Sequence, residues 1–425
     1  RVCSKTRTKT QSITRMPIFL PHERKHLPMD NLSQIAGGEL ATSPKDFESK
    51  MKEMMRSEVE RITNSIMRAE LSKSLGFEKN EQGKAKEAGD SRNGSYDRVV
   101  DTSFGPIKVS MPRDRNGDFE SKVLPPYTRR TYEVEDLVLR LYKSGLSNQD
   151  CADITEALHS TKYSKSTISS ITDVLEEDVK AYKERPIEGD WFAVFLDSTY
   201  VPLRRKTVQK EAINIAMGIT MSGERKMLGY SITPQESTEE WGMLLDDFMK
   251  RGLKSAKIVV SDGLAGLSSV LDSKLPGARH QRCFVHMARN LGAKVRKSDQ
   301  AEIMQEFMEL SRKKGAEEAI SAYSSFVKKW GLLYPSVRKW SEEISPDEIF
   351  AFYGFPEGLR TKIYTNNCIE GFNKQIKRMI KKHIQFVDEK AEEKVLVSIF
   401  LHYDEKVGKR KMRGWEMIEA MANKD

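Results

Sequence analysis

The strongest constraint on the fold is a change of periodicity after Pro186. Three β-type runs follow one another there, and the helical segment 237–251 comes next, opening with the Ser-x-x-Glu pattern of a capping box. Two further β-type runs then alternate with helical segments. Adjacent strands followed by this alternation predict a mixed α/β sheet. The five runs are WFAVFLD (191–197), AINIAMGITM (212–221), RKMLGYSIT (225–233), AKIVVSD (256–262) and HQRCFVH (280–286).

Three acidic residues stand out against this pattern. Asp197 and Asp262 each end an apolar run, and Glu370 lies near the start of a basic segment with helical periodicity. Ligand crevices in α/β sheets form at the carboxyl ends of strands, so these carboxylates can converge. Converging carboxylates bind hard divalent cations such as Mg²⁺, which serve phosphodiester chemistry.

Each of these acids alone also has a structural explanation. Asp197 could cap the turn after its strand, and Asp262 could be the N-cap of the next helix. Glu370 could form a salt bridge with Lys374, four residues later on the same helix. The combination of three acids with a basic helix favours a metal site over three unrelated structural roles.

Cys283 and His286 form a C-x-x-H pair that suggests zinc. A structural zinc site needs about four ligands, and the sequence has no second pair with suitable spacing. Only the isolated residues His280 and Cys368 could complete such a site. A role in orienting the neighbouring site or in helix packing is therefore the preferred interpretation.

The chain before the sheet is expected to begin with a helix and a β-hairpin. Apolar residues recur at helical spacing between residues 44 and 77, and their methionine-rich stripe predicts packing, not a cofactor site. Residues 99–111 predict two short strands that turn at Gly105-Pro106.

Residues 134–184 predict three helices. Ser147 is expected to cap the second, and Ser164 or Ser166 the third, which is expected to run to residue 184. This arrangement is typical of a helix-turn-helix that reads DNA, but it is equally typical of a plain three-helix bundle. The pattern alone does not choose between the two.

The distribution of charge indicates a polyanionic partner. The chain has 71 Lys and Arg against 62 Asp and Glu, a formal net charge of +9. Residues 1–30 carry seven Lys and Arg with two acids, and residues 371–387 carry five with none. Clusters of this kind favour nucleic-acid binding over a merely solvated surface.

The cysteine spacing and the hydropathy indicate which cellular compartment to expect for this protein. The four cysteines are widely scattered and form no C-x-x-C pair, which argues against a disulfide framework and fits a reducing cytoplasm. No uncharged apolar run approaches the ~18–20 residues of a membrane span, so no membrane association is expected.

Several separated motifs, in order along the chain, resemble the Mutator-type transposases of the insertion-sequence branch. The resemblance covers roughly residues 45–405. The motifs are RNGSYDRVVDTSFGPIKVSMPRDRNGDFESKVLPPYTRR, LYKSGLSNQD, SKSTISSITD, RPIEGDWFAVFLDSTYV, VVSDGLAGL, RCFVHMARNL and YTNNCIEGFNKQIKR.

This resemblance implies a ribonuclease H-like catalytic fold with an Asp-Asp-Glu triad. By motif, the triad falls on Asp197, Asp262 and Glu370, and the family's C-x-x-H falls on Cys283 and His286. This sequence departs from the family pattern at Ser198, Thr199, Pro202, Cys368 and Gly371. None of these departures removes an acid, but they leave the fine positioning of the substrate open.

The residue patterns and the resemblance together predict a division of the chain. We expect a basic, disordered segment at 1–44, and a mainly helical DNA-binding region at 45–185 that includes the hairpin and the helix-turn-helix-like helices. The first part of the catalytic domain is expected at 186–298, an all-helical insertion at 299–354, and the second part with the C-terminal helices at 355–425.

The implied activity is DNA transposition. Two Mg²⁺ or Mn²⁺ ions, about 3.5–4 Å apart in such sites, are expected on the triad. They would support cleavage at the transposon ends and transfer of the freed 3′-OH to target DNA. Two alternatives stay open, an inactive or domesticated transposase that only binds DNA and a hydrolytic nuclease of the same fold.

The expected partners are the terminal inverted repeats, the target DNA and a second copy of the chain, because two transposon ends must be brought together. The N-terminal region is expected to recognise the repeats. Phosphate contacts are expected from basic residues near the site, which are Arg204, Arg205, Arg289, Lys374, Lys377, Arg378, Lys381 and Lys382.

Overall fold

The computed structural model describes residues 43–79, 81, 89–187, 189–204, 208–380, 389–408, 410–412 and 415. The predicted disordered segment 1–44 lies almost entirely outside the described residues. No helix within the described ranges is long and apolar enough to cross a membrane.

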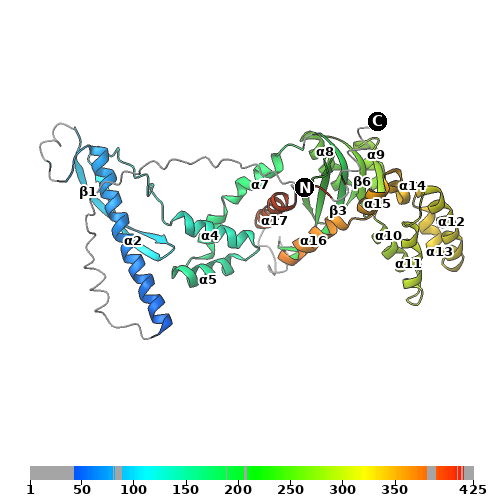
Figure 1. The fold of residues 1–425 in the computed structure, drawn as a ribbon, viewed down its shortest axis with the longest axis horizontal. Coiled ribbons are helices and arrows are strands. Elements are labelled where there is room, and N and C mark those ends of the chain that lie inside the picture. The colour runs from blue at the N-terminus through cyan, green and yellow to red at the C-terminus, as the bar shows by residue number, and fades with distance from the viewer. Residues whose placement is uncertain are drawn as a thin grey trace, which may run out of the picture.

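A five-stranded mixed sheet organises the second half of the chain, as predicted (Figure 1). Its strand order is β5-β4-β3-β6-β7. β3 pairs antiparallel with β4 and parallel with β6, β4 pairs antiparallel with β5, and β6 pairs parallel with β7. The strands are β3 (Gly189–Arg204), β4 (Val208–Thr220), β5 (Arg225–Thr233), β6 (Leu253–Ser261) and β7 (Arg279–Arg282).

Helices cover both faces of this sheet. Val194 and Leu196 of β3 pack in one cluster with α8 (Thr238–Lys250) and α9 (Leu267–Lys274). Their neighbour Phe195 packs in the other cluster, on the opposite face. Because side chains alternate along a strand, a strand covered on both faces reads as a continuous apolar run. On the second face lie α10 (Phe284–Gly292), α16 (Asn367–Ile380) and α17 (Glu389–Tyr403).

β3 extends further than the sequence predicted. The strand was expected to end at Asp197, but its pairing with β4 continues to Arg204 opposite Val208. Its pairing with β6 stops at Phe195 opposite Val260. β4, the antiparallel partner, continues to form backbone hydrogen bonds with β3 beyond the point where pairing with β6 ends. Asp197 therefore lies inside a strand, just beyond the end of the parallel pairing.

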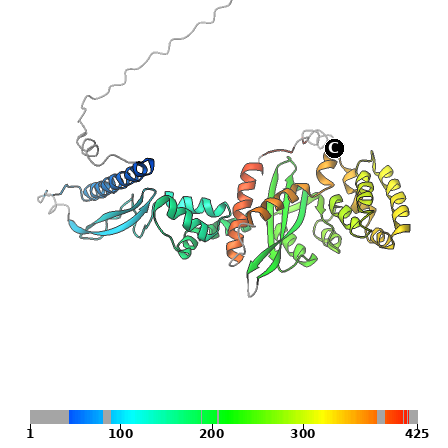
Figure 2. The same cartoon turned by 90° about the horizontal axis from the view of Figure 1, so that it is seen from below.

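The N-terminal elements lie beyond one end of the sheet (Figure 2). The helix α2 (Pro44–Leu75) begins at its N-cap Ser43 and ends at Gly76, whose left-handed φ of 78° suits glycine. It packs on the predicted hairpin of β1 (Arg92–Thr102) and β2 (Gly105–Asp114), whose turn is formed by Ser103 and Phe104 and lies two residues before the predicted Gly105-Pro106.

The prediction that the methionine-rich stripe of α2 packs internally is wrong for its first part. The core side chains of the hairpin pack on Met67, near the end of the helix, and only this end is buried in the structure. Six large apolar side chains before it are at least 39% exposed, namely Phe47, Met51, Met54, Met55, Ile62 and Ile66.

Four helices connect the hairpin to the sheet. Ser147 caps α5 (Asn148–His159) through a capping box, and Ser164 caps α6 (Lys165–Thr172), as the sequence indicated. The predicted third helix is wrong in its length, because it is divided into α6 and α7 (Leu175–Glu184). α4 (Tyr132–Lys143), α5 and α6 contact one another.

A helical segment follows α10 at the other end of the sheet (Figure 2). It consists of α11 (Gln300–Leu310), α12 (Ala316–Leu333), α13 (Pro335–Glu342), α14 (Pro346–Phe350) and η1 (Ala351–Gly354). Phe284 of α10 joins this segment to the sheet. Its ring stacks on Phe307 at 5.0 Å and meets Phe352 edge-on at 5.6 Å. The chain then returns through α15 (Glu357–Ile363) to α16.

We expect Phe284→Ala to lower the free energy of unfolding by about 3–5 kcal/mol, because it leaves a cavity where the helical segment meets the sheet. Urea denaturation followed by circular dichroism measures this change. Leu332→Ala is the matched control, since Leu332 is 81% exposed and its loss should cost about 0.5 kcal/mol or less. Equal effects of the two substitutions would contradict the packing described here.

Candidate active site

The register of the parallel strands brings Asp197 and Asp262 together. Phe195 of β3 lies opposite Val260 of β6, and each acid follows two residues later. Because side chains alternate, both acids are on the face of the sheet that α16 covers. Asp197 is buried and Asp262 is partly buried.

The turn after Asp262 depends on a glycine. Gly263 has a φ of 90°, in the left-handed region, and a Cβ there would lie 2.9 Å from Cδ of Arg282. The Arg282 guanidinium donates to the Gly263 carbonyl at 3.1 Å. The absence of a side chain at Gly263 therefore leaves room for the Arg282 guanidinium near Asp262.

The start of α16 is attached to the sheet by hydrogen bonds from both sides. The Phe284 backbone N–H donates to the Tyr364 carbonyl at 3.0 Å. The Asn366 side-chain amide donates to the Leu196 carbonyl at 3.2 Å, and its backbone N–H donates to Cys283 Sγ at 3.3 Å. Three residues after Glu370 on the same helix, the Asn373 side-chain amide donates to Asp197 Oδ2 at 2.7 Å. These contacts hold the start of α16 against β3, near enough for the charge of Glu370 to act on Asp197.

The three acids share one electrostatic environment. Burial raises the pKa of Asp197 to about 7, and the negative charges of Asp262 and Glu370 add to this rise, while the hydrogen bond from Asn373 opposes it. Burial also raises the pKa of Asp262, against the effect of backbone N–H groups and of Arg282. Asp262 and Glu370 therefore disfavour the ionised form of Asp197 unless a cation lies beside it.

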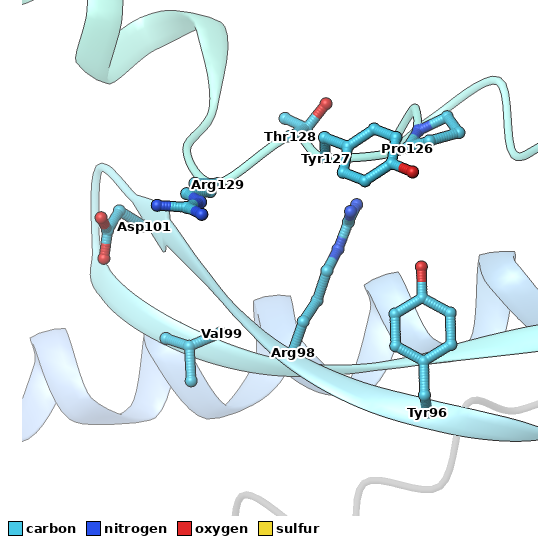
Figure 3. Close-up of a pocket in the computed structure, with 8 residues that line it drawn as sticks. All are labelled: Tyr96, Arg98, Val99, Asp101, Pro126, Tyr127, Thr128 and Arg129. Carbon is cyan, nitrogen blue, oxygen red and sulfur yellow. The ribbon is translucent and has the colours of Figure 1, made fainter.

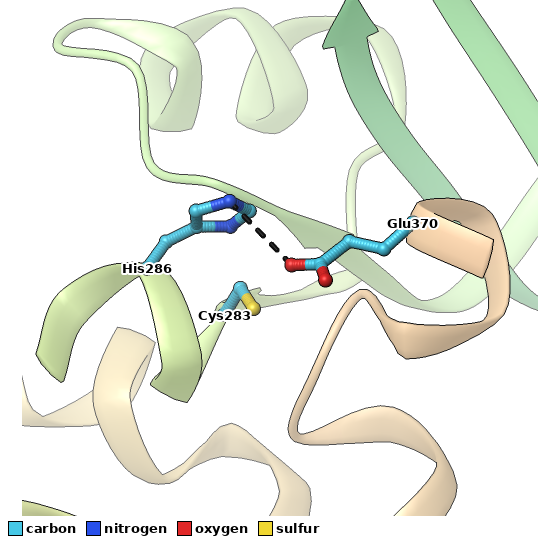
Figure 4. Close-up of side chains that lie close together, drawn as sticks. All are labelled: Cys283, His286 and Glu370. Carbon is cyan, nitrogen blue, oxygen red and sulfur yellow. Dashed lines mark ion pairs between the residues drawn. The ribbon is translucent and has the colours of Figure 1, made fainter. Parts of the chain in front are cut away.

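Glu370 also faces Cys283 and His286 (Figure 4). His286 Nε2 lies 3.6 Å and Arg289 Nη1 lies 3.8 Å from Glu370 Oε1. A ligand atom of Cys283, one of His286 and one of Glu370 all lie within 4.8 Å of one another. The structural explanation that paired Glu370 with Lys374 is thus not the arrangement found, because Lys374 is exposed and Glu370 turns toward α10.

The predicted fifth strand is shorter than expected, and this shortening creates the C-x-x-H geometry. β7 ends at Arg282, so Cys283 becomes the N-cap of α10 and His286 lies in its first turn. His280 donates or accepts hydrogen bonds with Ser261 and Ser268, which places it outside the group around Glu370.

Two further polar residues at the site were not singled out from the sequence. Glu236 lies where Asp262 and His286 act on its charge, and burial raises its pKa. Its Oε1 accepts a hydrogen bond from Trp241 Nε1 at 2.9 Å. Asn373 is 4% exposed and bonded to Asp197. A signal for Asn373 existed, since a side chain three residues after Glu370 shares its helix face.

The predicted DNA-contacting residues have different surroundings. Lys374, Lys377 and Arg378 are exposed on α16, and the Arg289 side chain is 56% exposed beside Glu370. Arg204 ends β3, but its side chain is not described. Arg205, Lys381 and Lys382 lie outside the described residues.

A separate groove of about 500 Å³ lies between β1 and the loop 125–131 (Figure 3). Arg98 points from the strand toward Pro126 and Tyr127, and Arg129 lines the same groove. Tyr127 is 94% exposed and has a φ of 65°, which is uncommon for a residue with a side chain. An exposed aromatic ring in a groove that is also lined by two arginines is a suitable surface for nucleic acid.

The donor set beside α16 fits hard divalent cations. Asp197 and Asp262 offer carboxylate oxygens on adjacent strands. Glu370 Oε1 is buried without a hydrogen-bond partner among the described residues, as a metal-ligating oxygen would be before an ion binds. The site could therefore hold Mg²⁺ or Mn²⁺.

A mixed α/β sheet with converging acids beside a basic helix defines a candidate enzyme of phosphodiester chemistry. Comparison with known proteins gives the family. The model of the Mutator family of transposases matches residues 34–409, and this chain belongs to that family.

Three named relatives are transposases of insertion sequences. The IS905 transposase of Lactococcus lactis is 39% identical over 364 residues, which is 85% of this chain and 92% of the relative. The IS1201 transposase of Lactobacillus helveticus is 37% identical, over 81% of this chain and 93% of the relative. The ISRM5 transposase of Rhizobium meliloti is 28% identical, over 82% and 87%.

The raised pKa of Asp197 predicts a pH dependence of stability. The folded protein binds a proton at Asp197 up to about pH 7, whereas the ordinary pKa of this carboxyl is 3.8. The stabilisation from that proton is complete below about pH 4 and is lost as the pH rises through about 7. Without metal, the free energy of unfolding of the wild type should fall by roughly 4 kcal/mol as the pH rises from about 4 to about 7. Asp197→Asn, which has no carboxyl at this position, should not show this fall. Urea denaturation in EDTA at several pH values measures it, and parallel profiles for the two proteins would contradict the assignment.

Proposed function

We propose that this chain cuts DNA at the ends of its transposon with divalent metal ions and joins the freed 3′-OH to target DNA. Asp197, Asp262 and Glu370 would hold the ions. The observation that supports this most directly is that Asp197 of β3 is buried where the charges of Asp262, just after β6, and Glu370 of α16 both act on it.

The proposed catalytic fold is ribonuclease H-like. Three consecutive antiparallel strands lead into two parallel ones, in the order β5-β4-β3-β6-β7. The helical segment 300–354 separates β7 from α16, as the resemblance implies for an insertion before the last acid. This order supports the proposal because it places the first acid on the central strand and the second on its neighbour.

The metal ions, when bound, would lower the pKa of the attacking water or 3′-hydroxyl and stabilise the leaving oxygen. The protein's own residues prepare the site for them. Asn373 fixes the orientation of the Asp197 carboxylate, and Arg282 offsets part of the charge beside Asp262. His286 and Arg289 hold Glu370 from the side of α10. A carboxylate that is already oriented loses less entropy when an ion binds.

DNA contacts would come from two surfaces. Lys374, Lys377 and Arg378 lie exposed on the helix that carries Glu370, where they would bind phosphates next to the reacting bond. The groove between β1 and the loop 125–131, together with the α4–α6 helices, would bind the terminal inverted repeats. A dimer or larger assembly would hold two ends together.

Two alternative functions are separable by experiment. A domesticated protein would bind transposon ends without cutting them, and the presence of all three acids argues against it. A hydrolytic nuclease would cut but would not join.

End cleavage tests the catalytic assignment. With Mg²⁺ and DNA that carries the transposon end, Asp197→Ala should lower the cleavage rate by roughly three orders of magnitude or more, because one ion loses a ligand. Asp272→Asn, an exposed acid on α9, should cleave like the wild type. Equal cleavage by Asp197→Ala and the wild type would rule out the proposed triad.

The same preparation distinguishes transposase from nuclease. Pre-cut ends with a free 3′-OH are supplied with target DNA, and joined products are separated on a denaturing gel. A transposase forms them in a reaction that needs Glu370, whereas a nuclease forms none.

The groove makes a prediction for DNA affinity. Arg129→Ala should weaken binding to the transposon end about tenfold and should reduce the slope of log affinity against log salt by about one. Fluorescence anisotropy at several salt concentrations measures both quantities. Arg338→Ala, with a side chain 71% exposed on the distant α13, is the control, and an unchanged slope in Arg129→Ala would exclude the groove from the DNA contact.

A further inference from the structure

We propose that Cys283, His286 and Glu370 form a binding site for one Zn²⁺ ion, chemically distinct from the hard-metal site of the paired strand acids. Their three ligand atoms lie within 4.8 Å of one another, although they come from segments more than eighty residues apart in the chain (Figure 4). A thiolate, an imidazole and a carboxylate form the donor set that zinc accepts, with Zn–S near 2.3 Å and Zn–N near 2.0–2.1 Å.

The local fold creates this cluster before any ion binds. Cys283 is the N-cap of α10 and His286 is three residues later, so both side chains lie at the same end of the helix. Glu370 is in the first turn of α16. The two helix starts are joined by the hydrogen bonds from Phe284 N–H to the Tyr364 carbonyl and from Asn366 N–H to Cys283 Sγ.

Two of the ligands have unsatisfied polar atoms. Glu370 Oε1 and His286 Nδ1 are buried and have no hydrogen-bond partner among the described residues. A buried polar atom without a partner costs about 1–3 kcal/mol. An ion bound to Glu370 removes the share of this cost that Glu370 Oε1 carries.

The donor set separates this site from the strand acids. Asp197 and Asp262 offer only oxygen, which suits Mg²⁺ and Mn²⁺, whereas the Cys283 thiolate favours softer ions. The Asn366 N–H···Sγ contact at 3.3 Å is the kind of outer hydrogen bond that accompanies a metal-bound thiolate. Three protein ligands would leave the fourth position of the ion open, unlike a closed structural site.

The structure also explains why the sequence argued against zinc. The fourth ligands considered from the sequence were His280 and Cys368. His280 is engaged with Ser261 and Ser268, and Cys368 packs against the hydrophobic core, so neither joins the cluster. The third ligand is a glutamate contributed by a distant helix, which no spacing rule could supply.

A consequence follows for regulation, and it rests on the catalytic role proposed for Glu370. A zinc ion bound to Glu370 withdraws that carboxylate from the hard-metal site. Zinc occupancy and DNA cleavage would therefore exclude each other.

Cobalt substitution tests the site directly. Co²⁺ is added to the full-length, metal-free, reduced protein, and the absorption spectrum is recorded. We expect a cobalt–thiolate charge-transfer band in the near ultraviolet that disappears when one equivalent of Zn²⁺ is added. Cys283→Ser should lose the band and should bind Zn²⁺ at least about a hundredfold more weakly, since losing even an outer-shell partner costs ten- to a hundredfold.

Matched variants make the result decisive. Cys368→Ser, which removes a cysteine two residues from Glu370, should keep the band, and so should Asp197→Asn, which disables the hard-metal site. If Cys283→Ser does not fold, His286→Gln carries the test, because it should also weaken Zn²⁺ binding while leaving the Cys283 core position intact.

A wild-type spectrum without the thiolate band, or zinc affinity unchanged in Cys283→Ser and His286→Gln, would overturn the proposal. Because the measurement needs no DNA cleavage, its outcome is independent of whether the proposed catalytic function holds.

Discussion

The attachment of the α16 N-terminus to the sheet is the interaction on which the site depends. Asn366 reaches both the Leu196 carbonyl and Cys283 Sγ, and Asn373 reaches Asp197. Asn366 is fully buried, so these bonds form away from competing water. Without them Glu370, which follows β7 by a long helical segment, would have no reason to meet Asp197. Glu370 is far from Asp197 in the sequence, and these hydrogen bonds are what bring its helix to the strand.

Burial of these acidic side chains is electrostatically unfavourable, and this indicates a functional site. Burial raises the pKa of Asp197 to about 7, and the nearby negative charges of Asp262 and Glu370 add to the rise. Strained electrostatics of this kind concentrate at functional sites. A divalent cation converts the mutual repulsion of the acids into attraction. On the other side of Glu370, the Cys283 thiol and the His286 imidazole take the place of the strand carboxylates. The ion preferred there is therefore zinc and not magnesium.

Local chemistry was predictable from the sequence, and long-range partners were not. Ser147 and Ser237 cap their helices as predicted, because a capping pattern spans only four residues. The proximity of Asp197 and Asp262 was predictable because each follows an apolar run that predicts a strand of the same sheet. The extent of β3 was missed because the antiparallel β4 sustains it. The exposed methionines of α2 were missed because periodicity marks an apolar face without showing what covers it. The alternative that paired Glu370 with Lys374 is wrong, because the partners of Glu370 come from α10, where β7 ends early and His286 and Arg289 lie beside it.

The central claim is that the three acids together hold hard divalent cations. Crystals soaked in Mn²⁺ and measured at the manganese absorption edge test it most directly. The account predicts anomalous density bounded by the carboxylates of Asp197, Asp262 and Glu370, and its loss in Asp197→Asn. Manganese bound elsewhere, with no density among these three carboxylates in the wild type, would contradict the account.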